Sequence, residues 1–183
     1  MMMLIYTIQV LTGQEKRVLK QLENLFCREL GESHDISVHF PQRQLMQKMS
    51  GKMVHKLQPV FPGYLFLSSQ DFPSKLFRLI TRLPDVFYFL PRQNSPQPLS
   101  LEDVDLIKPL LLSPKGITSL IDVHFDEDDR IVVHHGPFSG YEGRIIKVDR
   151  RKRRMRVALS LYGDGLHIDF GYRDVGPSTL KHP

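Results

Sequence analysis

The last third of the chain alternates short apolar runs with glycine turns, and this pattern leaves few folds open to it. The runs are RIVVHH, GRIIKVD, RMRVALSL and LHIDF, and the breaks between them include Gly136, Gly140 and Gly163. In RMRVALSL, polar and apolar side chains alternate as they do in a strand that buries one face. About sixty residues of this kind most simply form a small, strongly bent antiparallel barrel, which we expect over residues 122–183.

Residues 1–111 instead mix patterns typical of strands and of helices. Strands are expected at residues 4–10 and 36–40, in VFPGYLFL and in VFYFL. Apolar residues at helical spacing predict an amphipathic helix after the first strand; these are Val18, Leu22, Leu25 and Phe26. A basic, Met-rich stretch with Gly51 near its centre predicts a β-hairpin. We expect one mixed α and β domain here.

Capping residues predict where the helices begin. Thr12 and Glu15 have the spacing of a capping box. Asp71 is expected to cap a second helix that has a proline in its first turn. Ser100 is expected to open a last helix that runs to Leu111. The segment SPKGITS then reads as part of a linker over residues 112–121, between the two domains.

Composition restricts the classes of protein that the chain can belong to. The single Cys27 cannot form an internal disulfide, so we expect a reducing compartment. The apolar start MMMLIYTIQV is too short for a membrane span and has no basic leader or cleavage site, so we expect a buried strand and a soluble, cytoplasmic protein. Cys and His residues lack metal-ligand spacing, and we expect neither a metal nor a cofactor.

The segment VDRRKRRMRV places six basic side chains in ten positions, at the tip of an expected hairpin. One interpretation is a solvated turn, which is what most charge runs are. The other is a nucleic-acid contact, because phosphates would relieve the repulsion among like charges and release counterions. We favour the second interpretation. The candidate contact residues are Arg144, Lys147, Arg150, Arg151, Lys152, Arg153, Arg154 and Arg156.

The acidic segment FDEDDR could be a metal cluster of a nuclease, which would make the chain an enzyme acting on nucleic acid. Consecutive residues cannot all point at one ion, so we expect an exposed acidic turn and no enzymatic activity. His134 and His135 are interpreted as residues at a strand end, and Cys27 as a packing residue of the first helix.

Two groups of motifs carry a resemblance to a known family. The segments IYTIQVLTGQE, VFPGYLFL and PDVFYFL resemble the N-terminal domain of NusG-type transcription elongation factors, and DRIVVHHGPFSGYEGRIIKVD resembles their C-terminal KOW domain. The resemblance implies an α+β fold, with an antiparallel sheet flanked by helices joined flexibly to an SH3-like barrel. Three segments look most similar to LoaP-type paralogues, which are specialised antiterminators: IQVLTGQE, the hairpin rich in Lys and Gly ahead of FPGYLF, and DRRKRR. Ile5, where the family often has Trp, and YGDGLHIDF depart from the family pattern.

The resemblance also implies a partner. In the family, the N-terminal domain binds the clamp helices of the largest RNA polymerase subunit, and the apolar pocket for them corresponds here to Tyr6, Phe61, Tyr64 and Phe66. Desolvated aromatic anchors suit such an interface. The alternative is that VFPGYLFL is simply a central strand covered on both faces.

Three functions therefore stay open. The favoured one is a specialised antitermination factor that binds polymerase through residues 1–111 and a nascent RNA hairpin through its basic barrel. The second is a housekeeping elongation factor whose barrel binds Rho or a ribosomal protein. The third is a ribosome-associated RNA-binding protein that makes no polymerase contact.

Overall fold

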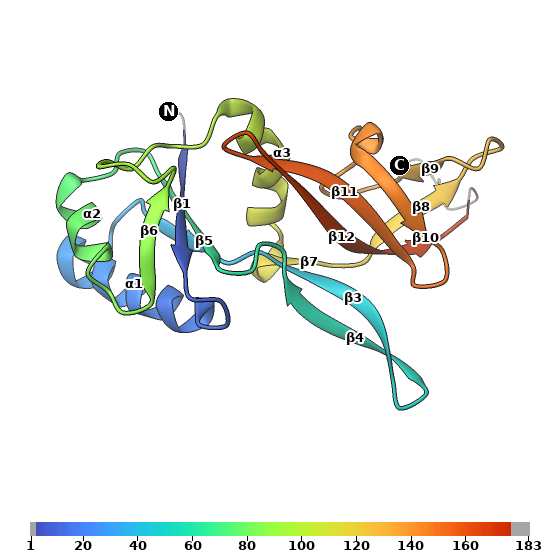
Figure 1. Cartoon of the computed structure of the whole chain (residues 1–183), viewed down its shortest axis with the longest axis horizontal. Helices are drawn as coiled ribbons and strands as arrows, with labels where there is room; N and C mark the ends of the chain where they lie inside the picture. The colour runs from blue at the N-terminus through green and yellow to red at the C-terminus, as the bar shows by residue number, and fades with distance from the viewer. Residues whose placement is uncertain (1–2, 177–183) are drawn as a thin grey trace. The chain divides into compact units, whose positions relative to one another are not determined.

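The computed structural model describes residues 3–176, which divide into two compact units. The first unit takes the described residues up to Pro41 and Phe61–Asp105, and the second takes Gln42–Val60 and the chain from Leu106 onward (Figure 1). The division falls inside helix α3 (Leu101–Leu111). Residues 42–60 therefore belong with the C-terminal part of the chain, although 45 residues of the first unit follow them in the sequence.

The first unit is built on a four-stranded antiparallel sheet. Its strands are β1 (Leu4–Val10), β2 (Ser37–His39), β5 (Tyr64–Ser69) and β6 (Val86–Leu90), in the order β2-β5-β1-β6. Helices α1 (Glu15–Leu30) and α2 (Ser74–Ile80) supply the remaining core of this unit. The combination of β-sheet and helices expected from the sequence is confirmed.

One core joins the helices of the first unit to its sheet. The apolar residues predicted for α1 are all buried, and they pack with Ile8 of β1 and with Leu65 and Leu67 of β5. Because β5 and β1 occupy the centre of the sheet and are buried along most of their length, both faces of these strands are covered. The side chains of β5 therefore contribute to packing on both sides.

The helix starts differ in part from the expected ones. Thr12 is not the N-cap of α1, which is Gln14. Glu15 instead accepts hydrogen bonds from the backbone N–H of Gly13 at 2.9 Å and of Gly63 at 2.8 Å, and so connects the helix start to the turn before β5.

The predictions for the two later helices have different outcomes. Pro73, not Asp71, is the N-cap of α2, because the helix begins later than the sequence pattern indicated. The prediction for α3 is confirmed, since the Ser100 hydroxyl accepts a hydrogen bond from the Asp103 N–H at 3.1 Å.

The second unit contains the curled C-terminal sheet, as the sequence predicted. Its strands are β8 (Ile121–Phe125), β9 (Ile131–Val133), β10 (Ile145–Asp149), β11 (Arg154–Leu161) and β12 (Asp164–Asp174), in the order β10-β11-β12-β8-β9. The pairs are antiparallel except β12 with β8. Short 3-10 turns occupy Pro114–Gly116 and Glu142–Arg144. Alternate residues of β11 are buried from Met155 to Leu161, which confirms the expected alternation.

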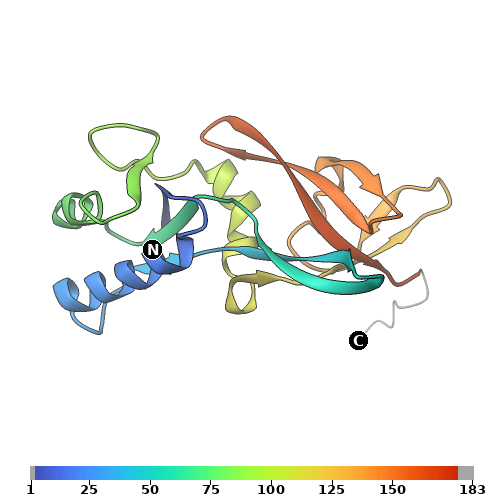
Figure 2. The same cartoon turned by 60° about the horizontal axis from the view of Figure 1, so that its bottom comes forward.

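A β-hairpin joins the barrel in this unit. Strands β3 (Gln42–Met49) and β4 (Lys52–Pro59) meet at a turn through Gly51, as predicted, and β3 also pairs with β7 (Ile117–Thr118). Figure 2 shows the hairpin from a second direction. Gly171 of β12 lies against β3 so closely that an added Cβ would be 2.6 Å from the carbonyl oxygen of Gln44. Only glycine allows the two strands to approach this closely.

No helix between residues 3 and 176 combines the length and apolar character needed to span a lipid bilayer.

Candidate nucleic-acid interface

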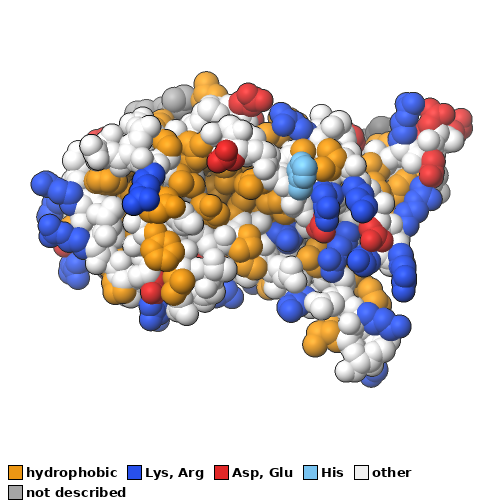
Figure 3. Space-filling view, viewed as in Figure 1, with side chains coloured by type: hydrophobic (Ala, Val, Ile, Leu, Met, Phe, Trp, Pro, Cys, Tyr) orange, Lys and Arg blue, Asp and Glu red, His pale blue; other side chains and the backbone are white. Residues whose placement is uncertain are grey.

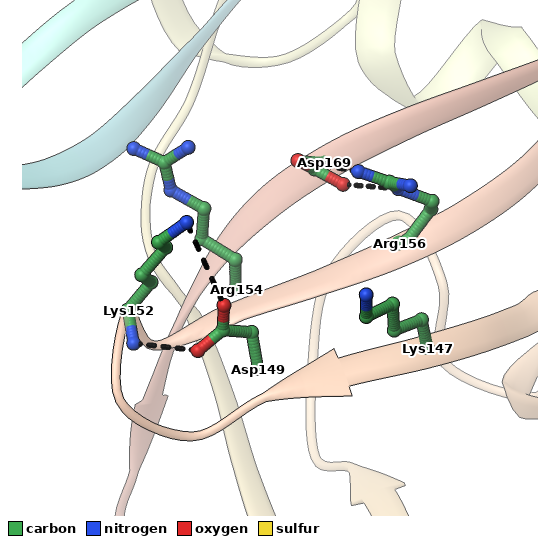
Figure 4. A pocket seen from close by; sticks show the side chains of 6 residues that line it. All are labelled: Lys147, Asp149, Lys152, Arg154, Arg156 and Asp169. Atoms are coloured by element: carbon green, nitrogen blue, oxygen red, sulfur yellow. Dashed lines mark hydrogen bonds and ion pairs between the residues drawn. The ribbon is translucent and has the colours of Figure 1, made fainter.

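A charged pocket of about 100 Å³ opens on the outer face of β10, β11 and β12 (Figure 4). We call it the charged pocket. Its lining is Lys147, Asp149, Lys152, Arg154, Arg156 and Asp169. Four cations and two carboxylates leave it with a net positive charge. Figure 3 shows Lys and Arg side chains gathered over these strands.

Strand register builds the pocket. Because Met155 and Val157 of β11 point into the core, Arg154 and Arg156 between them point outward. Arg156 pairs with Lys147 of β10 on one side and with Asp169 of β12 on the other, so the three side chains form a row across the sheet. In the neighbouring row, Arg154 pairs with Asp149 of β10. The two rows bring residues that are distant in sequence onto one small surface.

Asp169 holds Arg156 in place. The Arg156 guanidinium donates two hydrogen bonds to the Asp169 carboxylate, at 2.7 and 3.2 Å. These bonds lower the pKa of Asp169, and the positive charges of Arg156, Arg154 and Arg43 lower it further. The same hydrogen bond raises the pKa of Arg156. Both groups therefore stay charged at neutral pH, and Arg156 is pre-positioned at the pocket wall.

Replacing Asp169 by Asn is expected to weaken folding and to strengthen anion binding. The free energy of unfolding should fall by about 0.5–1 kcal/mol at neutral pH, because the pair is partly exposed. Affinity for a polyanion should rise roughly threefold, since removing one negative charge about 6 Å from a phosphate removes ~0.7 kcal/mol of repulsion in water.

The contribution of Asp169 to the free energy of unfolding depends on pH in a definite direction. A carboxyl whose pKa is lowered by folding stabilises the folded chain above its unfolded pKa, about 3.9, and loses that contribution as the pH falls through the folded pKa. The stability difference between the wild type and Asp169→Asn should therefore be constant from pH 7 to about 5 and shrink as the pH falls below about 4. Urea unfolding across this range measures it, and a difference that does not shrink below about pH 4 would contradict the role given to the ion pair.

Arg154 is only partly engaged by the protein. One of its terminal nitrogens donates to the carbonyl oxygen of Met46 in β3, at 3.4 Å. Its Nε is buried and has no hydrogen-bond partner among the described residues. The guanidinium therefore connects the pocket to the hairpin and keeps donor capacity for a bound anion.

The two lysines of the pocket are less constrained. The backbone N–H of Lys152 donates to Asp149 at 2.9 Å, while its ammonium lies 4.0 Å from the same carboxylate. Lys147 is exposed and forms no ion pair with the described part of the chain. Both ammonium groups can move to meet a ligand.

The remaining basic candidates lie outside the pocket. Residues 150–153 form the loop between β10 and β11, so the predicted hairpin tip is confirmed. Arg150 turns away to an ion pair with Asp129 and lies 4.1 Å from the centre of the Phe125 ring. Arg151 and Arg153 are exposed in the loop, and Arg144 lies in a 3-10 turn. The structure thus brings together four of the eight candidates.

The four aromatic candidates do not share one face. Tyr6 pairs with Leu67 and belongs to the core beneath the helices, 5.0 Å from the Phe72 ring. Burial, and then the charge of Asp71, raise the pKa of Tyr6. Phe66 points to the opposite face of β5.

On that opposite face, Phe61 packs edge-on against Phe66, with ring centres 5.2 Å apart, and both side chains are buried. Tyr64 is the one candidate of the four that is half-buried. It is therefore the most accessible of them.

The structure also places the acidic segment, His134 and Cys27, which the sequence suggests as metal or packing residues. Residues 126–129 form the exposed acidic turn that was expected, in which Asp126 accepts backbone hydrogen bonds from Asp128 and Arg130. Between residues 3 and 176, no three His, Cys, Asp or Glu side chains gather as metal ligands. The Nε2 atom of His134 lies 3.0 Å from the Nδ1 atom of His124. Cys27 is exposed, so its interpretation as a packing residue is wrong.

Sequence reasoning missed two contributors to this site. Asp169 was read only as part of the strand LHIDF, although its place between inward Ile168 and Phe170 marks it as outward-facing. The sequence around Arg43 in β3 gives no indication that this residue belongs to the site. Its interaction with Asp169 and Arg154 depends on how the hairpin packs against the barrel.

Known proteins resemble the chain along most of its length. Residues 4–108 match the family model described as transcription termination factor nusG. The transcription termination/antitermination protein NusG of Buchnera aphidicola is 27% identical over 184 residues, with 93% of each chain covered. The protein of the same name from Helicobacter pylori is 27% identical over 180 residues, covering 93% of this chain and 96% of the relative.

A solved structure shows a similar fold. The structure of Thermotoga maritima NusG matches with a TM-score of 0.51 at 14% identity, covering 93% of this chain and 94% of that one. At this level of identity the likeness concerns the fold alone.

Proposed function

The chain belongs to the NusG family, and from this premise we propose that it is a specialised antitermination factor of the LoaP type. It acts in transcription termination or antitermination, the activity named for its relatives. The first unit, up to Pro41 and from Phe61 to Asp105, binds the clamp helices of RNA polymerase, and the barrel over residues 122–183 binds nascent RNA.

The charged pocket is the observation that carries the RNA-binding proposal. Four cations, Lys147, Lys152, Arg154 and Arg156, share one outward face of the barrel. Arginine forks bind phosphate through paired hydrogen bonds, and mobile lysines add point charges. A barrel that contacted only another protein would have little need of this concentration of positive charge. The exposed Arg151 and Arg153 extend the same surface at the loop.

The polymerase contact is assigned to the first unit. Tyr64 is the proposed anchor, because it is the half-buried member of the aromatic set. The buried Phe61 and Phe66 support the strand that carries it. Tyr6 lies on the other face of the sheet from Phe66, where it packs in the core beneath the helices.

The decisive experiment is purification of the tagged full chain from cells, followed by identification of bound proteins and sequencing of bound RNA. Recovery of polymerase subunits with one leader RNA supports the proposal. Polymerase with RNA from all transcripts, or with Rho or a ribosomal protein, indicates a housekeeping factor instead. Ribosomal proteins without polymerase would reject the assignment to transcription.

A further inference from the structure

The β3–β4 hairpin is strongly basic and contains no acid. Residues 42–60 include Arg43, Lys48, Lys52 and Lys56 and neither Asp nor Glu. Figure 3 shows basic and apolar side chains at its tip, which projects below the basic side chains over β10–β12. A surface of this sign attracts polyanions.

Several contacts hold the hairpin to the barrel. Leu45 of β3 is 2% exposed, and Gly171 leaves no room for a side chain between β12 and β3. Arg43 lies 5.9 Å from the centre of the Phe170 ring, and burial lowers its pKa. The bond from Arg154 to the Met46 carbonyl joins the charged pocket to β3. The hairpin base and the pocket are therefore parts of one packed unit.

Strand register places two lysines of β4 on the side that faces the barrel. Lys56 is directly opposite Leu45, and Lys52 is opposite Met49. Residues opposite each other in an antiparallel pair share a face, and so do residues two apart along a strand. Arg43, two residues before Leu45 and on the same face of β3, reaches the Phe170 ring of β12, so this face of the hairpin turns toward β12. Lys52 and Lys56 project on the same side, where both are exposed.

We propose that the hairpin and the charged pocket together bind the phosphate backbone of a paired RNA stem, an inference that rests on the proposed RNA-binding function. Lys52 and Lys56 contact the stem from the hairpin, while Lys147, Lys152, Arg154 and Arg156 contact it from the barrel. The stem lies across the two sets of cations.

The absence of aromatic residues favours a paired stem over a single strand. Residues 42–60 and 145–161 contain no Phe, Tyr or Trp. Proteins that bind single strands stack bases on exposed aromatic rings, whereas double-stranded RNA is bound through its shape and its phosphates. A surface that has cationic side chains and no aromatic rings suits binding to the phosphate backbone of RNA.

The test compares Lys52→Gln/Lys56→Gln with the wild type, both as full chains. Each is titrated with a stem-loop RNA and with an oligouridine that has the same number of phosphates, over a series of salt concentrations. Affinity for the stem should fall roughly tenfold at about 0.1 M salt, and the slope of log K against log salt should become less steep by about 1.5, from two lost contacts. Affinity for oligouridine should change much less.

The control is Lys16→Gln/Lys20→Gln, which removes the same charge from exposed positions of α1. It should bind the stem as the wild type does. If the hairpin variant keeps wild-type affinity and slope while the wild type binds the stem, or if it weakens oligouridine binding equally, the hairpin proposal is overturned. Failure of the wild type to bind either RNA would instead overturn the proposed function itself. Unchanged melting temperatures of the variants ensure that binding alone is compared.

Discussion

Replacing Lys147, Arg151 and Lys152 together by Gln is expected to lower the affinity of the full chain for a stem-loop RNA by about a hundredfold at roughly 0.1 M salt. All three side chains are exposed. Each phosphate contact contributes about 0.7–0.9 to the salt slope, so three lost contacts should make that slope less steep by roughly 2 to 3. Filter binding or fluorescence anisotropy over a salt series measures both quantities.

The choice of residues separates binding from folding. Lys147, Arg151 and Lys152 make no contribution to the buried core, so the variant should unfold at the same denaturant concentration as the wild type. Lys16, Lys20 and Arg82 are exposed in the first unit, and their triple Gln variant is the matched control for net charge. Equal slopes for the wild type and the barrel variant would mean that the basic run is a solvated turn.

Replacing Phe66 by Ala is expected to lower the free energy of unfolding by about 3–5 kcal/mol, the usual cost of removing a buried aromatic side chain. Phe66 is 0% exposed and lies on a central strand against Phe61. Denaturant unfolding followed by circular dichroism measures the loss. Because this is a large part of the stability of a typical domain, Phe66→Leu, which removes fewer buried atoms and should lose less stability, serves as a folded second variant.

Phe87 provides the matched control. It lies on the edge strand β6 and is 53% exposed, so Phe87→Ala should cost less than about 1 kcal/mol. If Phe66→Ala unfolds like the wild type but loses affinity for polymerase, Phe66 is a contact residue and its packing role is wrong. A loss of stability together with normal polymerase affinity of folded Phe66→Leu would assign it to the core.

Local patterns in the sequence were sufficient to predict the elements of this chain. Alternation in residues 154–161 predicted the buried face of β11, and helical spacing from Val18 to Phe26 predicted the buried face of α1. Gly51 marked the hairpin turn. These predictions succeed because side-chain direction in a strand or helix depends on spacing within a few residues. The helix caps at Thr12 and Asp71 failed because both helices begin later than their polar residues indicated.

The residues of the site were predictable only as a set of candidates. The basic run was visible in the sequence, but nothing local indicated that Arg150 pairs with Asp129, 21 positions away. Similarly, the resemblance grouped Tyr6 with Phe66, whereas strand alternation and register place them on opposite faces of the sheet.

By itself, then, the sequence determined the strands, the amphipathic helix, the basic loop and, through its motifs, the family. Only the tertiary structure decided which charges converge. Asp169 meets Arg156 because β12 pairs with β11 in one register, and the hairpin lysines face the barrel because Gly171 allows β3 to approach β12. The physical reason is that spacing along the chain sets the face of each side chain, while packing between distant segments sets which faces meet.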